Sequence, residues 1–160
     1  MKTMAGGFLD RERTKPVDCR AALKWVLQDP NIHTTIPGII TFDQLTENFS
    51  VMENIEMTEE EKAHIEEGRL ISGLYCDQCG QCIATCRRHL PVNDMMRAYM
   101  YAYGYRHYEE ARSLMENHGH DAEACRDCGQ CSVICTKGFN VSERIADIAR
   151  ITAIPKDFLA

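Results

Sequence analysis

The order of apolar runs, helix-capping residues and chain breakers predicts helices over most of the second half of the chain. Thr58 and Glu61 form a capping-box signature, which predicts a helix over residues 57–70. Helix-forming residues over 95–103 and 105–117, separated by a glycine, predict two further helices. This part of the chain is therefore expected to be mainly α.

The first third has a different pattern. Asp18 caps a predicted helix, residues 33–36 are a short β-prone run ended by Pro-Gly, and Thr41 with Gln44 forms a second capping box. Residues 2–4 are a second, weaker strand candidate. Helix, strand, helix is the order of parallel α/β units, but so few strands cannot close a barrel. We expect an incomplete α/β segment here.

Charge and hydropathy exclude several partners. The net charge is −6, and 18 Lys and Arg residues are scattered among 24 Asp and Glu residues, so nucleic acid is not an expected partner. The sequence has no run of roughly 20 apolar residues, as a membrane helix needs, and its first residues do not resemble a signal peptide. We expect a cytoplasmic protein that does not enter a membrane.

Cysteine is the residue type that indicates the chemistry. In a reducing compartment, the 9 cysteines of this chain point to metal binding rather than to disulfides. Eight of them fall in an internal repeat: C-D-Q-C-G-Q-C-I-A-T-C begins at Cys76, and C-R-D-C-G-Q-C-S-V-I-C begins 49 residues later at Cys125. At the same offset the similarity continues weakly into a helix, with Asn93 and Ser142 as the expected N-caps.

Spacing of this kind is typical of [4Fe-4S] clusters. C-x2-C-x2-C brings three thiolates to one cluster, and in two-cluster proteins the fourth cysteine of each run ligates the other cluster. Two clusters are thus predicted. One is held by Cys76, Cys79, Cys82 and Cys135, and the other by Cys125, Cys128, Cys131 and Cys86. Gly80 and Gly129 are expected to let the backbone pass close to the clusters.

Other uses of these cysteines fit less well. Structural zinc sites use two separated cysteine pairs rather than two runs of four. Radical chemistry on a cluster leaves one iron without a protein ligand, whereas eight cysteines can saturate two clusters. The clusters could also staple a small domain, a role that can coexist with electron transfer. One-electron transfer is the favoured function.

These cysteine runs resemble the dicluster ferredoxin domains. The gap of 38 residues between Cys86 and Cys125 resembles the alpha-helical ferredoxin type more than the compact β-hairpin type. One departure is that proline, which often follows the fourth cysteine in such families, is replaced by Arg87 and Thr136. This departure concerns loop shape rather than cluster binding.

The first third resembles the end of an aldo/keto reductase. The similar segments are M-K-T-M-A-G-G, A-A-L-K-W-V-L-Q-D-P, T-T-I-P-G and Q-L-T-E-N, in that order along residues 1–48. The resemblance implies the last strand-helix units of a TIM barrel, followed by a ferredoxin domain. The catalytic Asp, Tyr, Lys and His of that family belong to an earlier part of the barrel, so no catalytic residue is expected in this sequence.

The same resemblance implies contacts to NADP(H), if the missing barrel portion is supplied. In that family the I-P-G turn and the helix after it hold the adenosine and phosphate end of the nucleotide, and the helix N-terminus offers amides to phosphate. The corresponding cofactor-binding residues are Gly38, Thr41, Gln44, Glu47 and Asn48. Ile40 stands where a polar phosphate contact is common, which weakens a preference for the 2'-phosphate.

Taken together, the sequence predicts a mainly α chain: residues 1–56 as a remnant of the last two strand-helix units of a reductase barrel, and residues 57–160 as an alpha-helical ferredoxin-like dicluster domain. The expected function is electron relay as the C-terminal part of an aldo/keto reductase-like oxidoreductase, with the missing barrel or a redox protein as partner. The alternative is a complete, free-standing electron carrier that docks on a partner enzyme.

Overall fold

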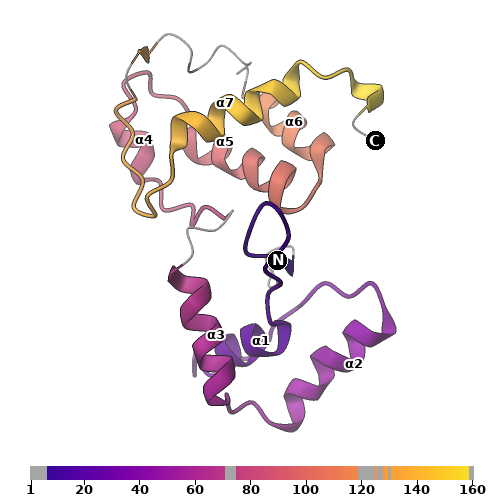
Figure 1. Cartoon of the computed structure of the whole chain (residues 1–160). Helices are drawn as coiled ribbons and strands as arrows, with labels where there is room; N and C mark the ends of the chain where they lie inside the picture. The colour runs from indigo at the N-terminus through magenta and orange to yellow at the C-terminus, as the bar shows by residue number, and fades with distance from the viewer. Residues whose placement is uncertain (1–6, 71–74, 119–124, 126–127, 130, 159–160) are drawn as a thin grey trace. The chain divides into compact units, whose positions relative to one another are not determined.

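Capping side chains fix where the helices of the first unit begin. This unit, Met1–Gly73, contains α1 (Cys19–Leu27), α2 (Phe42–Ser50), the 3₁₀ turn η2 (Val51–Glu53) and α3 (Glu59–Leu70) in the computed structural model (Figure 1). Asp18 accepts a hydrogen bond from the Ala21 amide at 2.9 Å, as predicted. Both capping boxes also form, because Thr41 and Thr58 each accept from the amide three residues later.

The structure describes residues 7–70, 75–118, 125, 128–129 and 131–158. Its second unit is Leu74–Ala160, so the division falls after α3, whereas we expected it between residues 56 and 57. Within the described ranges no helix is both long and apolar enough to cross a membrane.

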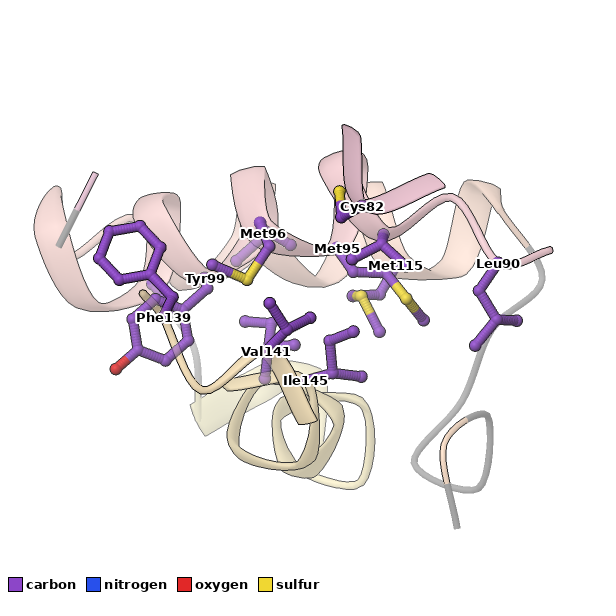
Figure 2. Packing of buried hydrophobic residues seen from close by; sticks show 14 of the residues in the cluster. Cys82, Leu90, Met95, Met96, Tyr99, Met115, Phe139, Val141 and Ile145 are labelled. Atoms are coloured by element: carbon purple, nitrogen blue, oxygen red, sulfur yellow. The ribbon is translucent and has the colours of Figure 1, made fainter. Parts of the chain in front are cut away.

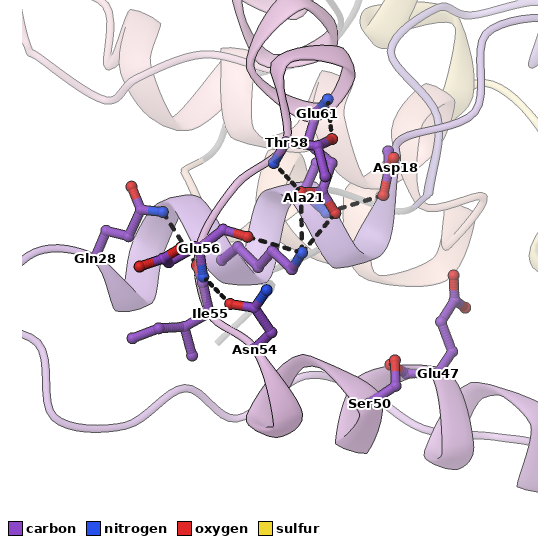
Figure 3. Close-up of polar contacts among 11 residues, drawn as sticks. Asp18, Ala21, Gln28, Glu47, Ser50, Asn54, Ile55, Glu56, Thr58 and Glu61 are labelled. Atoms are coloured by element: carbon purple, nitrogen blue, oxygen red, sulfur yellow. Dashed lines mark hydrogen bonds and ion pairs between the residues drawn. The ribbon is translucent and has the colours of Figure 1, made fainter.

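A buried ion pair connects the helices of the first unit. Lys24 on α1 is only 3% exposed, and its Nζ lies 2.8 Å from a carboxylate oxygen of Glu61 on α3. The same ammonium donates to the Glu56 carbonyl at 3.1 Å (Figure 3). Around it the apolar core is small, with Ala21, Leu23 and Val51 as its buried residues. Polar contacts therefore carry much of the packing in this unit.

The expected strand at residues 33–36 is wrong. This segment has no regular secondary structure, and the described residues contain no strand, only an isolated bridge between Phe8 and Pro16. The other candidate, residues 2–4, lies outside the described residues. A β-prone run becomes a strand only when it pairs with another strand, and the described part of the unit contains none. No barrel segment is formed within it, and the chain is mainly helical.

The second unit is built from helices that follow the cysteine runs. Its elements are α4 (Gln81–Thr85), α5 (Val92–Tyr99), the π-helix η3 (Met100–Gly104), α6 (Tyr108–Asn117), α7 (Val141–Thr152) and the 3₁₀ turn η5 (Lys156–Phe158). α5, α6 and α7 pack against one another. The helix predicted over 95–103 corresponds to the end of α5 and the π-helix η3. The helix predicted over 105–117 corresponds to α6, which begins at Tyr108.

Methionine and isoleucine side chains fill the core of the second unit. Met95, Met96, Met115 and Ile148 are each at most 2% exposed. Figure 2 shows the methionines gathered between the helices, with Val141 and Ile145 on the facing element. Unbranched thioethers adapt to irregular space, which suits a core that must also pack against the cysteine loops.

The N-caps predicted at Asn93 and Ser142 are wrong. α5 and α7 begin at Val92 and Val141, which are equivalent positions 49 residues apart in the repeat. The residue that caps α7 is Asn140, whose side chain accepts from the Glu143 amide at 3.3 Å. Both helices start earlier than expected, at valines that are buried in the core.

Candidate metal centre

The two cysteine loops share one backbone feature at equivalent positions. Gly80 and Gly129 have φ angles of +75° and +61°, a left-handed conformation that glycine adopts without strain. A Cβ atom on Gly129 would meet nothing within 4 Å, so the backbone angle rather than space requires glycine there. The structural repeat thus extends from the cysteines to the shape of the loops that carry them.

A first cavity, called cavity A, is lined by Cys76, Cys79 and Cys82 of the first run and by Cys135 of the second run. Met96 and Ile134 also line it. Its volume is about 20 Å³. A space of this size holds about one water molecule, so a cluster here requires the lining side chains to move outward.

Cavity B lies at the equivalent place in the other half. It is lined by Cys125, Cys128 and Cys131 of the second run and by Cys86 of the first, and its volume is about 180 Å³. Ile145 lines cavity B as Met96 lines cavity A, and these two residues are equivalent in the repeat. Val141 lines both cavities, so they lie next to each other.

Hydrogen bonds at Thr85 join the two cysteine runs. The Ser132 hydroxyl donates to the Thr85 carbonyl at 2.6 Å, and the Ile134 amide donates to the Thr85 hydroxyl at 3.4 Å. Thr85 and Ile134 are themselves equivalent residues of the repeat. Because each lies just before the fourth cysteine of its run, these bonds bring the ends of the two runs together and direct each last cysteine toward the opposite loop.

Polar contacts also reach the cysteine sulfurs of cavity A. The Gln78 amide donates to Cys76 Sγ at 3.4 Å, and Cys79 Sγ shares a hydrogen bond with the Thr136 hydroxyl at 3.7 Å. Lys137 and Asp77 form an ion pair at 2.9 Å that ties the second run to the first loop. Hydrogen bonds to ligating sulfurs are among the factors that set cluster potentials.

The thiols differ in how readily they ionise. Hydrogen bonds from the Gln81 amide and the Thr136 hydroxyl lower the pKa of Cys79. Burial, followed by the charge of Cys76, raises the pKa of Cys82. Burial and the neighbouring thiolates raise the pKa of Cys125 to about 11. Four crowded thiolates are costly without a cation between them, and a bound iron core would supply that charge.

The donor set fits a cluster better than a single ion. Structural zinc needs four ligands within about 2.3 Å of one point. In the described part of the chain, no three His, Cys, Asp or Glu side chains converge closely enough to hold one metal ion. Cluster ligands each bind a different iron and so stand farther apart around a larger core. Four cysteines line each cavity, the number that a cubane cluster requires, although cavity A must widen to admit one.

The residues expected to contact a nucleotide lie together in and just before α2. Thr41 and Gln44 hydrogen-bond each other in the capping box, and the Gln44 side chain also accepts from the Ile40 amide at 2.8 Å. Asp43 places a negative charge in the first turn of the helix. Both features compete with a phosphate at this helix N-terminus, so the nucleotide contacts remain a prediction that requires further protein around them.

Residues 75–140 match the family model described as a 4Fe-4S dicluster domain. The matched segment contains the eight repeat cysteines, and it indicates iron–sulfur electron transfer for this part of the chain. Neither the curated proteins nor the solved structures gave a match. The comparisons provide no support for the resemblance of the first third to an aldo/keto reductase.

Several contacts in the second unit were not predicted from the sequence. Thr85 and Ser132 stand between cysteines, and nothing in their spacing predicts a bond across the repeat. Arg144 was also missed; its guanidinium carbon lies 3.7 Å from the centre of the Phe139 ring. Met96 and Ile145 are the exception, because the repeat alignment already pairs them as equivalent positions.

Proposed function

We propose that this chain holds two [4Fe-4S] clusters and relays electrons as the C-terminal part of an aldo/keto reductase-like oxidoreductase, without a substrate-reduction site of its own. The observation that carries the proposal is the composition of the cavities: each is lined by three cysteines of one run and the last cysteine of the other. This crossed arrangement is the one used in proteins with two adjacent cubane clusters.

Each cluster has four ligands in this proposal. Cavity A supplies Cys76, Cys79, Cys82 and Cys135, and cavity B supplies Cys125, Cys128, Cys131 and Cys86. When bound, the clusters supply one-electron chemistry; the chain orients them, limits solvent around them and hydrogen-bonds their sulfurs. Because Val141 lines both cavities, an electron would have a short path from one cluster to the other.

Analysis of the full chain, purified without oxygen, tests this proposal. Eight iron and eight acid-labile sulfide per chain are expected, with EPR signals from two reduced clusters. A protein that contains zinc and no sulfide would refute the proposal in favour of a structural metal site. Four iron per chain would limit it to one cluster.

Exposed apolar side chains on the first unit support a role within a larger assembly. Ile36, Ile40, Phe42 and Phe49 are between 65% and 92% exposed, and α2 has no buried residue. Apolar side chains gathered on one short segment are commonly covered by another protein surface. The cover we propose is the earlier part of a reductase barrel, which would also be needed for Gly38, Thr41, Gln44, Glu47 and Asn48 to hold NADP(H).

The alternative is a free-standing electron carrier whose first unit docks on a partner enzyme. The two candidates differ in the size of the native polypeptide. An antibody to the cysteine domain would detect a species much heavier than 18.2 kDa if the chain is the tail of a barrel enzyme. A species of 18.2 kDa would contradict the leading proposal and favour the carrier.

A further inference from the structure

The π-helical turn η3 meets the chain where the first cysteine run begins. Its register is set by the Tyr105 amide, which donates to the Met100 carbonyl five residues earlier at 3.0 Å. Turns of this kind are rare and frequently occur at functional sites. Met100 and Gly104 are the first and last residues of the turn. Each of them adjoins one of two consecutive residues at the start of that run.

The Met100 side chain holds the backbone of the first cysteine. The Cys76 amide donates to the Met100 sulfur at 3.3 Å, and Cys76 is one of the cysteines that line cavity A. A thioether is a weak acceptor, but a partly buried amide without any partner is costly. This bond therefore gives the Cys76 backbone a defined place beside η3.

Gly104 leaves room for the ring of the residue before that cysteine. Gly104 is buried, and a Cβ atom added to it would lie 2.9 Å from Cε1 of Tyr75 and 3.3 Å from its hydroxyl oxygen. Carbon atoms pack best at about 3.5–4.0 Å, so the ring would have to move. The Tyr75 ring packs against the core of the second unit, and its centre lies 5.8 Å from that of the Tyr105 ring. A larger residue at position 104 would therefore displace Tyr75 and, with it, the neighbouring Cys76.

The equivalent residues in the other half of the repeat are all alanines. At the same offset of 49 residues, positions 100 and 104 correspond to Ala149 and Ala153, and position 75 corresponds to Ala124. Alanine offers neither a sulfur acceptor nor a ring, so these equivalent residues cannot make the same two contacts. The regular α-helix α7 also extends through Thr152, past the position where the π-helical turn begins in the first half.

We propose that Met100 and Gly104 are positioning residues for the cluster ligand Cys76, so that the cluster in cavity A depends on η3 and the cluster in cavity B does not. This inference rests on the proposed binding of two clusters. Met100 acts through the Cys76 amide, and Gly104 acts through the Tyr75 ring. Loss of either contact lets the start of the first cysteine run open more often, and such local openings expose the cluster to solutes.

Gly104→Ala tests the contact with the ring. Alanine is normally the better helix former, so any loss comes from the clash rather than from the helix itself. In the full chain, purified without oxygen, an iron chelator should remove the cavity A cluster about tenfold faster than in the wild type, as expected for an overpacked site. The cavity B cluster should be lost at the wild-type rate. EPR follows both signals, which are assigned with Cys131→Ala because it removes a ligand of cavity B.

A second substitution separates positioning from general damage. Tyr75→Leu removes the ring atoms that a Cβ atom at position 104 would meet. In the Tyr75→Leu background, Gly104→Ala should therefore change the rate of cluster loss very little. The same acceleration with and without the ring would overturn the proposal, because it would mean that alanine acts through the helix and not through Tyr75.

Met100→Leu tests the contact with the sulfur. Leucine is similar in size but cannot accept from the Cys76 amide, so the cavity A cluster should be lost about threefold faster, the effect of one weak hydrogen bond. Met115→Leu is the matched control, because it makes the same change at a buried methionine of the same core.

The outcomes of these experiments are distinct. Rates in Met100→Leu that equal the Met115→Leu control, or equal acceleration at both cavities, would overturn the proposal. If Gly104→Ala does not fold, this comparison of the two methionine variants decides. Iron and sulfide analysis of the wild-type chain tests the proposed function separately, and a wild-type chain without two clusters would refute that function itself.

Discussion

Two patterns of cluster binding are possible, and they differ only in the fourth cysteine of each run. That cysteine binds either the cluster of its own run or the cluster of the other run. Cys135 ends the second run but lines cavity A with the first three cysteines of the first run, and Cys86 ends the first run but lines cavity B. The Ser132 and Ile134 hydrogen bonds to Thr85 hold the ends of the two runs side by side. This contact is consistent with an exchange in which each fourth cysteine joins the three cysteines of the other run. The bonds between the runs therefore accompany the grouping of each fourth cysteine with the other run.

Cysteine substitutions test that exchange. Cys135→Ala should damage the same cluster as Cys79→Ala, because both remove a sulfur from cavity A. The EPR spectrum of the surviving cluster should then be the same in these two variants. Cys131→Ala is the control, since it removes a ligand from cavity B and should leave the other signal. A Cys135→Ala spectrum that matches Cys131→Ala instead would mean that each run binds its own cluster.

At the scale of single elements, α7 depends on a cap outside the repeat motif. Asn140 accepts from the Glu143 amide at 3.3 Å and from the Ser142 hydroxyl at 2.9 Å. Asn140→Ala should lower the free energy of unfolding of the second unit by about 1 kcal/mol, because an N-cap is lost. Urea titration followed by circular dichroism measures the change. Asn93→Ala in α5 is the control, and an equal loss there would show that Asn140 has no special capping role.

The pairing of α1 with α3 should depend on pH. The hydrogen bond from Lys24 lowers the pKa of Glu61 from its ordinary value of 4.5. Because the pKa of Glu61 is lower in the folded protein than in the unfolded chain, the Lys24–Glu61 pair contributes fully to stability above pH 4.5. This contribution is lost as the pH falls through the folded-state pKa of Glu61. The protection factors of amides in α1 and α3, taken relative to the intrinsic exchange rate at each pH, should therefore be lower at pH 3 than at pH 6.

Glu61→Gln is the matched variant for this test. It keeps the size of the side chain but cannot ionise, so the protection factors in α1 and α3 should vary less with pH than in the wild type. If both proteins show the same pH dependence, another group is responsible for it. The second unit provides an internal reference, because Glu61 does not belong to it.

Local signals predicted these elements better than long-range ones. The boxes at Thr41 and Thr58 and the cap at Asp18 were correct because each bond spans three residues and needs nothing else. The strand at 33–36 was wrong because a strand depends on a distant partner. The grouping of the cysteines around two cavities followed from their spacing, whereas the position of Arg144 could not be predicted because it depends on three-dimensional contacts with Phe139 and Tyr99.

At the scale of the whole molecule, the two units are stabilised by different means. The first has few buried apolar residues and relies on capping bonds and on the Lys24–Glu61 pair. The second has a methionine-rich helical core, yet its cysteine loops place crowded thiols beside that core. Any metal bound there would contribute folding free energy to the second unit alone.

Removal of iron should therefore weaken the second unit selectively. After treatment with an iron chelator and a reductant, hydrogen exchange should speed up in α4, α5 and α7, which carry or adjoin the cavities, by at least about tenfold, equivalent to about 1.4 kcal/mol of local stability. Exchange in α1 and α3 should stay within error of the loaded protein. Mass spectrometry of peptic fragments from the same sample reports both units, so each measurement contains its own control. Equal acceleration in both units would show that the first unit depends on the clusters as well, and no change in either would show that the helical core of the second unit stands without them.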